Sequence, residues 1–199
     1  MKKIIISILL TIGLSTNVFA VEGNINAGKD KSAMCAACHG GDGNSLVPMY
    51  PKLSSLSAGY IVKQLSQFKD GTRQDPVMAG MVAALSEQDM VDLAAYFSAQ
   101  KRTASESSVT ELGKGLYFGG NSENGVTACV ACHGLKGKGM AAAGFPAIAS
   151  QNAEYIKIQL EKFRSGVRAN DNNGMMRNVA LGLTDDEIKA LSQYIASLK

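Results

Sequence analysis

All the cysteines and histidines of the chain stand in two copies of one short motif. Cys-Ala-Ala-Cys-His occupies residues 35–39, and Cys-Val-Ala-Cys-His occupies residues 129–133. The chain has 199 residues, with 4 Cys and 2 His in total. Three kinds of chemistry use thiols at this spacing: a redox-active disulfide, zinc coordination and covalent attachment of c-type haem. The two motifs therefore contain whatever site these residue types make.

The setting of the motifs favours haem over the other two chemistries. A redox disulfide of this spacing normally follows a strand of an α/β unit, and a structural zinc site takes four ligands where each motif offers three. Two thiols can instead bond to the haem vinyl groups while the adjacent histidine faces the iron, because the motif spans about one helical turn. The sequence therefore predicts two covalently bound haem c groups, attached at Cys35, Cys38, Cys129 and Cys132, with His39 and His133 as axial iron ligands.

The chain contains a tandem duplication. The cysteine motif recurs at an offset of 94 residues, YIVKQLSQFKDGTR recurs as YIKIQLEKFRSGVR at an offset of 95, and LSEQDMVDLAAYFSAQK recurs as LTDDEIKALSQYIASLK at an offset of 98. Repeats in the same order indicate two copies of one unit. The polar segment KRTASESSVT between them is typical of a linker. We predict a signal peptide at 1–20, a first domain at 21–100, a linker at 101–110 and a second domain at 111–199.

Each copy is predicted to be all-α. Ile61, Leu65 and Phe68 share one helical face, and the same pattern recurs in the second copy. Ser86 and Thr184 are placed as N-caps, and only the second has the full capping-box pattern. No stretch alternates with period two over the length of a strand. Domains this small often need a metal or another staple, and a buried haem would complete each helical core.

The sixth iron ligand must come from another residue type, because both histidines are already assigned. Methionine is the usual alternative to an open site, and it raises the reduction potential. Met78 and Met176 occupy matching places, seven residues before a leucine in each copy, whereas Met81 and Met175 each correspond to a valine. We predict Met78 and Met176 as ligands; the alternative is that they only fill the core.

Two further pairs recur around these candidate ligands. Pro51 and Pro146 lie 12 and 13 residues after their histidines, where a carbonyl could accept the proton on Nδ1; the alternative is a simple turn. Arg73 and Arg168 close matching segments and could pair with haem propionates, because guanidinium suits carboxylates. Their alternative is a solvated surface position.

The first twenty residues predict export to the periplasm. Lys2 and Lys3 precede an apolar run at 4–14, and Ala20 stands where a signal peptidase would cut. The run is short for a spanning helix of about 20 residues, although an uncleaved anchor is the alternative. Without Lys2 and Lys3 the chain has 18 basic and 17 acidic residues, a net charge of +1. That balance predicts no nucleic-acid partner.

The chain resembles the dihaem cytochrome c4 family over nearly all of residues 21–199. The resemblance is carried by CAACHGGDGNS, YPKL, KDGTR before Met78, CVACHG, GFPAI and NDNNG before Met176. It implies two class I cytochrome c domains packed face to face, His/Met ligation at both irons and periplasmic electron transfer. It also implies a respiratory donor, a terminal oxidase as acceptor and association with the inner membrane. The longer FGGNSENGVTA segment before Cys129 departs from the family and is expected to change a surface loop.

The predicted function is that of an electron carrier and not of an enzyme, because ligated irons leave no position for substrate. One alternative is the cytochrome subunit of a flavin-dependent, sulfide-type dehydrogenase. The other alternative is a dihaem peroxidase, but that enzyme needs an iron with a position open to peroxide, and the two candidate methionine ligands argue against this.

Overall fold

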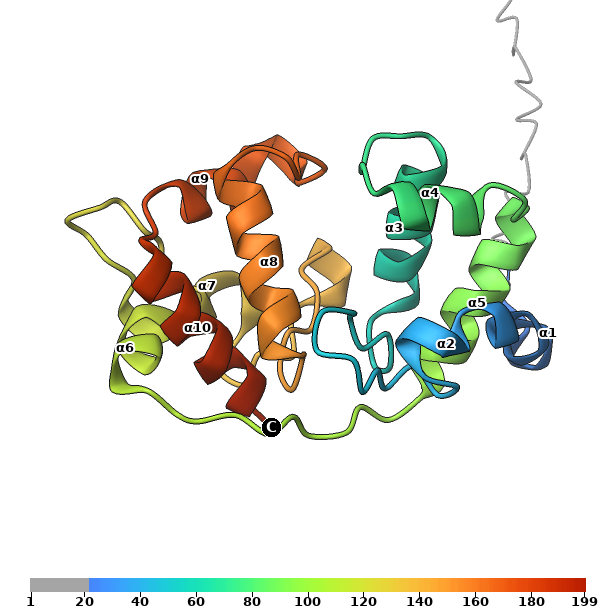
Figure 1. The fold of residues 1–199 in the computed structure, drawn as a ribbon, viewed down its shortest axis with the longest axis horizontal. Coiled ribbons are helices and arrows are strands. Elements are labelled where there is room, and N and C mark those ends of the chain that lie inside the picture. The colour runs from blue at the N-terminus through green and yellow to red at the C-terminus, as the bar shows by residue number, and fades with distance from the viewer. Residues whose placement is uncertain (1–21) are drawn as a thin grey trace, which may run out of the picture.

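The computed structural model describes residues 22–199, so the predicted signal peptide at 1–20 lies outside the described residues. Two helical domains lie side by side, with α3 and α8 nearest their junction (Figure 1). Within residues 22–199 there is no β-strand, only two isolated antiparallel bridges. The prediction of an all-α chain is confirmed. In the same range, no helix combines the length and apolar character that crossing a membrane requires.

The helices occur in the same order in both domains. The first domain contains α1 (Ile25–Lys31), η1 (Ser32–Met34), α2 (Ala36–His39), α3 (Ala58–Lys69), α4 (Pro76–Val82) and α5 (Glu87–Ala99). The second contains α6 (Glu111–Gly119), α7 (Val130–His133), η2 (Ala141–Ala143), α8 (Ala153–Arg164), η3 (Asn172–Gly174), α9 (Met175–Leu181) and α10 (Asp185–Ser197).

Each domain has its own hydrophobic core. In the first, Ile61 and Phe68 of α3 pack with Leu93 and Phe97 of α5. In the second, the predicted apolar face of α8 packs with the matching face of α10. The helical stripes read from the sequence are therefore core-facing in both copies, as the spacing of three and four residues requires.

A glycine permits the tightest helix crossing in each domain. A Cβ at Gly28 of α1 would lie 2.0 Å from the Asp92 carbonyl oxygen in α5, and one at Gly113 of α6 would lie 2.2 Å from that of Ala190 in α10. Only a residue without a side chain allows the two backbones to approach this closely.

Both last helices begin with a full capping box. Thr184 pairs with Glu187 as expected. Ser86 and Asp89 do the same: the Ser86 Oγ accepts from the Asp89 amide at 3.1 Å, and the Asp89 carboxylate accepts from the Ser86 amide at 2.9 Å. The expectation of a full box only at Thr184 was wrong, because the shorter aspartate also reaches the N-cap amide.

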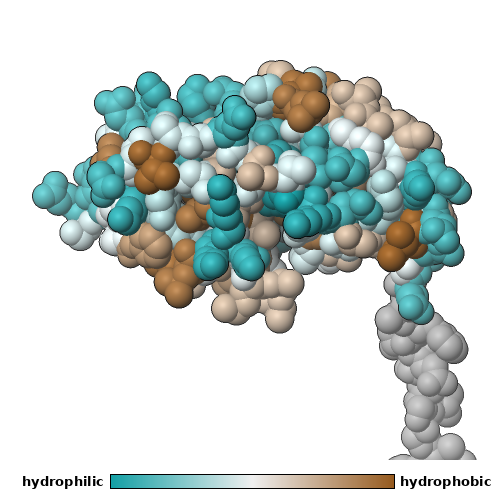
Figure 2. Space-filling model, turned by 90° about the horizontal axis from the view of Figure 1, so that it is seen from below, coloured by the Kyte–Doolittle hydropathy of each residue, from teal (hydrophilic) through white to brown (hydrophobic). Residues whose placement is uncertain are grey.

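Residues 101–110 contain no helix, yet polar contacts hold them to both domains. The buried Lys52 Nζ donates to the Thr103 carbonyl and to the Ser105 hydroxyl, each at 2.9 Å. The Ser105 hydroxyl in turn donates to the Ser150 carbonyl at 2.7 Å. The segment runs along the lower edge of the molecule, and seen from below, hydrophobic residues form separate patches among hydrophilic ones (Figures 1 and 2).

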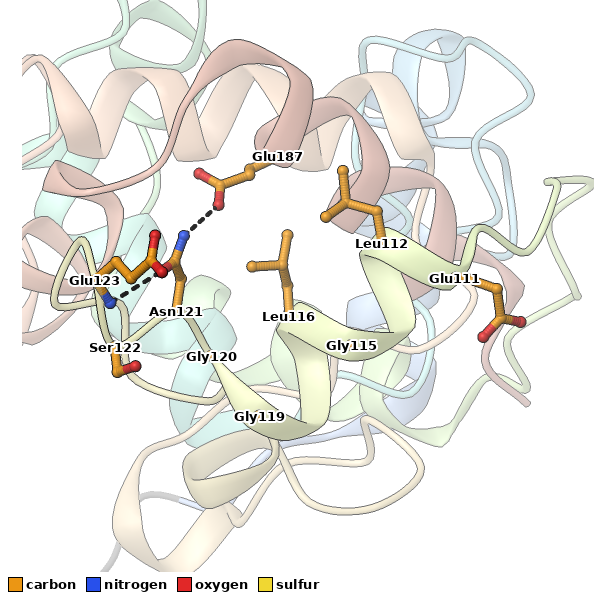
Figure 3. Close-up of a pocket in the computed structure, with 10 residues that line it drawn as sticks. All are labelled: Glu111, Leu112, Gly115, Leu116, Gly119, Gly120, Asn121, Ser122, Glu123 and Glu187. Carbon is orange, nitrogen blue, oxygen red and sulfur yellow. Dashed lines mark hydrogen bonds between the residues drawn. The ribbon is translucent and has the colours of Figure 1, made fainter.

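The longer segment before Cys129 folds into a surface turn. Asn121 and Val126 form one of the isolated bridges, and the Asn121 amide donates to the Glu187 carboxylate at 2.8 Å. Figure 3 shows this contact at the edge of a shallow pocket between α6 and α10. None of the residues that line this pocket is a candidate ligand.

Candidate haem sites

Each cysteine motif forms one short helical turn. The His39 amide donates to the Cys35 carbonyl and the His133 amide to the Cys129 carbonyl, both at 3.0 Å. This turn brings the first cysteine and the histidine of each motif together. None of the four cysteines is joined to another in a disulfide among residues 22–199, and all four are partly buried. Among residues 22–199, no three Cys, His, Asp or Glu side chains are grouped to hold a bare metal ion.

Each motif histidine is held through one ring nitrogen by a proline carbonyl. The Nδ1 of His39 lies 2.9 Å from the Pro51 carbonyl oxygen, and that of His133 lies 3.0 Å from the Pro146 carbonyl oxygen. A carbonyl only accepts, so Nδ1 carries the proton and Nε2 keeps its lone pair for a metal.

The electrostatic setting favours the same neutral form of the imidazole. Burial lowers the pKa of both His39 and His133, while the hydrogen bond to the proline carbonyl opposes this effect. Burial has the larger effect because it removes the water that stabilises the charged imidazolium. Each ring is therefore suited to bind iron through Nε2 at neutral pH.

Two tyrosines that the sequence reasoning missed anchor the ends of the motif helices. The Tyr96 hydroxyl donates to the Gly41 carbonyl at 2.8 Å, and the Tyr117 hydroxyl donates to the Gly134 carbonyl at 2.6 Å. Tyr96 belongs to the last helix of its domain and Tyr117 to the first helix of the other. The two tyrosines are not counterparts in the repeat. Tyr96 aligns with Tyr194, whose ring centre lies 5.5 Å from that of Tyr117. Comparison of the copies could therefore have drawn attention to Tyr96 but not to Tyr117.

Both candidate methionines lie at the start of matching short helices. Met78 in α4 and Met176 in α9 are partly buried, and each packs against the core of its own domain. Asp75 caps α4 by accepting from the Met78 amide at 3.1 Å. α9 begins instead at Gly174, which has no side chain to cap the helix. The assignment of these methionines to iron stays a prediction.

Arg73 and Arg168 are buried, with 9% and 8% of their surface exposed. The alternative of a solvated surface position was therefore wrong, because the facing domain covers each side chain. The Arg73 guanidinium lies 4.5 Å from the centre of the Phe68 ring, and that of Arg168 lies 4.4 Å from the centre of the Phe163 ring. Such stacking suits a planar delocalised cation.

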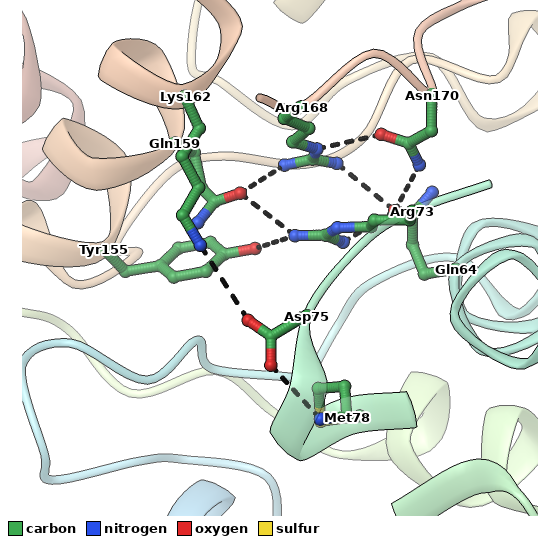
Figure 4. Close-up of polar contacts among 9 residues, drawn as sticks. All are labelled: Gln64, Arg73, Asp75, Met78, Tyr155, Gln159, Lys162, Arg168 and Asn170. Atoms are coloured by element: carbon green, nitrogen blue, oxygen red, sulfur yellow. Dashed lines mark hydrogen bonds and ion pairs between the residues drawn. The ribbon is translucent and has the colours of Figure 1, made fainter. Parts of the chain in front are cut away.

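The two arginines share acceptors across the domain junction (Figure 4). The Gln64 side-chain oxygen accepts from Arg73 at 2.6 Å and from Arg168 at 3.2 Å. The Gln159 oxygen accepts from the same two at 3.0 and 2.9 Å. The Tyr155 hydroxyl accepts from Arg73 and the Tyr60 hydroxyl accepts from Arg168, each at 3.2 Å, so the arrangement is nearly symmetric.

This junction fits a cofactor that carries carboxylates. None of the ion pairs between described residues includes Arg73 or Arg168. Two buried guanidinium groups without an anion are costly, and haem propionates are carboxylates that would supply the negative charge. The four cysteines outside any disulfide and the oriented histidines agree with the same cofactor.

The comparisons with known proteins agree with this geometry. The cytochrome c family model matches residues 25–101 and again residues 111–199. Cytochrome c4 of Pseudomonas aeruginosa is 41% identical over 201 aligned residues, covering 100% of both chains. The crystal structure of reduced recombinant cytochrome c4 from Pseudomonas stutzeri has a TM-score of 0.86 at 41% identity, covering 89% of this chain and 100% of that chain.

A more distant relative is named for a different role. The thiosulfate dehydrogenase electron acceptor of Stutzerimonas stutzeri is 38% identical over 178 residues, covering 86% of this chain and 82% of its own.

Two consecutive cytochrome c domains, each with a Cys-x-x-Cys-His turn, define a dihaem c-type cytochrome. Its two cofactors are covalently bound haem c groups, and it transfers electrons to and from redox partners. By its likeness over the full chain, it belongs to the cytochrome c4 family.

Proposed function

We propose that the chain carries electrons between periplasmic redox proteins with His39 and Met78 on one iron and His133 and Met176 on the other. When bound, each haem supplies an iron that takes up and releases one electron. The observation that carries the proposal is the proline carbonyl at each Nδ1, 2.9 and 3.0 Å away. It leaves Nε2 of both histidines free to bind iron, in a fixed orientation.

The remaining candidate residues have separate roles in this proposal. The four cysteines hold the two haem groups covalently, so neither haem can dissociate from the protein in the periplasm. The thioether sulfurs of Met78 and Met176 favour the reduced metal. With both axial positions taken by side chains, no position is left for a substrate, and the protein acts as a carrier and not as an enzyme.

Arg73 and Arg168 are proposed to pair with the haem propionates. Their burial, the absence of an anionic partner within residues 22–199 and their shared acceptors support this role. The shared acceptors also support a role in keeping the two domains in one relative orientation. That orientation would let an electron pass from one domain to the other within the molecule.

The location and partners follow from the leader and from the relatives. The predicted signal at 1–20 supports export to the periplasm, with a peripheral position at the inner membrane. We propose a respiratory donor and a terminal oxidase as partners. A thiosulfate dehydrogenase is a second candidate donor, because a relative that is 38% identical is named the electron acceptor of such an enzyme. The alternative, that the chain is the cytochrome subunit of a flavin-dependent dehydrogenase, stays a prediction.

The ligand assignment is tested by absorbance. The oxidised protein should contain two haems per chain and show the far-red band of methionine bound to Fe(III). Met78→Ala and Met176→Ala should each remove half of that band, while Met81→Ala and Met175→Ala, the neighbouring controls, should keep it whole. Retention of the full band in either ligand variant would disprove that assignment.

The partner assignment is tested by mixing. Reduced protein is combined with a purified terminal oxidase, and oxidised protein with a thiosulfate dehydrogenase and its substrate. The first mixture tests the acceptor, and a failure of the oxidase to oxidise the protein would overturn that partner. The second mixture tests the alternative donor, and a failure of the dehydrogenase to reduce the protein would rule that donor out.

A further inference from the structure

The segment that joins the domains places Arg102 between two equivalent turns. Its Nε donates to the Ser54 carbonyl at 2.8 Å, and its Nη1 donates to the Ala149 carbonyl at 3.0 Å and to that of Ala147 at 3.3 Å. Ser54 and Ala149 correspond at the offset of 95 residues that also aligns Pro51 with Pro146. One guanidinium group therefore joins the same turn in both copies.

These are the turns that hold the two histidines. Pro51, three residues before Ser54, accepts from His39, and Pro146, three residues before Ala149, accepts from His133. Each turn is short and closely tied to its own domain.

The ties are the same in both copies. The amides of Leu53 and Ser54 donate to the Gly43 carbonyl at 2.7 and 3.2 Å. Those of Ile148 and Ala149 donate to the Gly137 carbonyl at 2.7 and 3.0 Å. A shift of the carbonyls that Arg102 binds would therefore move the proline carbonyls as well.

Arg102 also brings a charge into the junction. Its Nη2 is buried and has no hydrogen-bond partner among residues 22–199, and none of the ion pairs in that range includes Arg102. Burial lowers the pKa of Arg102 to about 10, so the side chain is still charged at neutral pH. Because Arg102 is bound to the turns that hold both candidate iron ligands, its positive charge would oppose the extra positive charge of Fe(III) at those sites.

We propose that Arg102 is a positioning residue for both haem sites, which fixes the two histidine-bearing turns relative to each other and favours the reduced state of both irons. This inference depends on the proposed ligation by His39 and His133. The role is separate from simple attachment of the domains, which neutral contacts also provide. The Gln151 side chain accepts from the Lys52 amide at 2.7 Å and donates to the Lys52 carbonyl at 2.9 Å.

The first test compares Arg102→Gln with Lys101→Gln in the holoprotein by redox titration. Both variants lose one positive charge, but Lys101 is exposed. Arg102→Gln should lower both midpoint potentials, on the order of tenfold in the Fe(III)/Fe(II) ratio at a fixed applied potential, which is about 59 mV for one electron. Lys101→Gln should change them by less than a third of that amount. No shift in Arg102→Gln, or equal shifts in the two variants, would overturn the proposal.

The second test uses Arg102→Lys and hydrogen exchange. A single ammonium keeps the charge but lacks the planar fork that reaches both turns. The potentials should therefore fall less than in Arg102→Gln, while the amides of Leu53, Ser54, Ile148 and Ala149 exchange faster. Faster exchange in one turn only, or in neither, overturns the proposal. This variant decides the question even if Arg102→Gln does not fold.

Comparison of Arg102→Gln with the wild-type protein distinguishes failure of the role of Arg102 from failure of the proposed histidine ligation. A normal methionine–iron band with unchanged potentials in Arg102→Gln would defeat the role of Arg102 alone. Spectra of the wild type that show one or both irons without the histidine would defeat the proposed ligation itself.

Discussion

Gly113→Ala in α6 should destabilise the second domain severely. The added Cβ would lie 2.2 Å from the Ala190 carbonyl oxygen and 2.7 Å from its carbonyl carbon, where ordinary contacts begin at 3.4 Å. The backbones of α6 and α10 would therefore have to separate by more than about 1 Å. Overpacking typically costs about 1–3 kcal/mol, and we expect about 3 kcal/mol here because backbone cannot rotate away as a side chain can.

A loss of this size is large compared with the stability of a domain. Native proteins are stable by about 5–15 kcal/mol, and a loss of ~3 kcal/mol lowers the Tm of a domain this small by roughly 12–24 °C. The damage should also reach the haem site, because Tyr117 on the same helix holds the Gly134 carbonyl at 2.6 Å. Half of the far-red methionine band should therefore be lost at a lower temperature than in the wild type.

The assay is thermal and urea unfolding of the holoprotein, followed by far-ultraviolet circular dichroism and by the far-red band. Gly115→Ala is the matched control on the same helix, since its Cβ would meet nothing within 4 Å. It should stabilise the helix by roughly 0.5–1 kcal/mol. Gly28→Ala should repeat the loss in the first domain, with a Cβ 2.0 Å from the Asp92 carbonyl oxygen. A Tm for Gly113→Ala equal to that of the wild type would refute the reasoning.

Two other perturbations have defined outcomes. Asp75→Ala removes the N-cap that accepts from the Met78 amide, which should cost about 1 kcal/mol of stability. The first haem should then lose its methionine band at a lower urea concentration, whereas Asp75→Asn should keep most of the cap. Loss of the band at the same urea concentration in the wild type and in Asp75→Ala would contradict this. The pKa of Glu187 is lowered, first by the hydrogen bond from the Thr184 amide. Its stabilisation should therefore be complete above the ordinary carboxyl pKa of about 4.3 and be lost as pH falls. Glu187→Gln should flatten this dependence in urea unfolding between pH 7 and pH 3, and an unchanged slope would count against it.

The local features of this fold could be predicted because the information lies within a few residues. The all-α class followed from apolar residues three and four apart, such as Ile61, Leu65 and Phe68. The N-caps could be predicted from one side chain at the start of each helix. The full capping box at Ser86 could not, because it depends on whether the short Asp89 side chain reaches the Ser86 amide, which it does at 2.9 Å.

The surroundings of the site could be predicted only in part. Pro51 and Pro146 were found because both copies place a proline at nearly the same distance from the histidine. For Arg73 and Arg168 the repeat showed that the residues correspond, but not whether they were buried. Their burial depends on the facing domain, and the local spacing of residues along the chain gives no information about it.

The amino-acid sequence by itself determined the cofactor, the duplication and the helical class, because each depends on spacing along one chain. The tertiary structure alone decided how the two copies share groups. Gln64 serves both arginines, and Arg102 joins two turns that lie 95 residues apart. These contacts form only when the domains pack together, since each acceptor and its donors come from different parts of the chain.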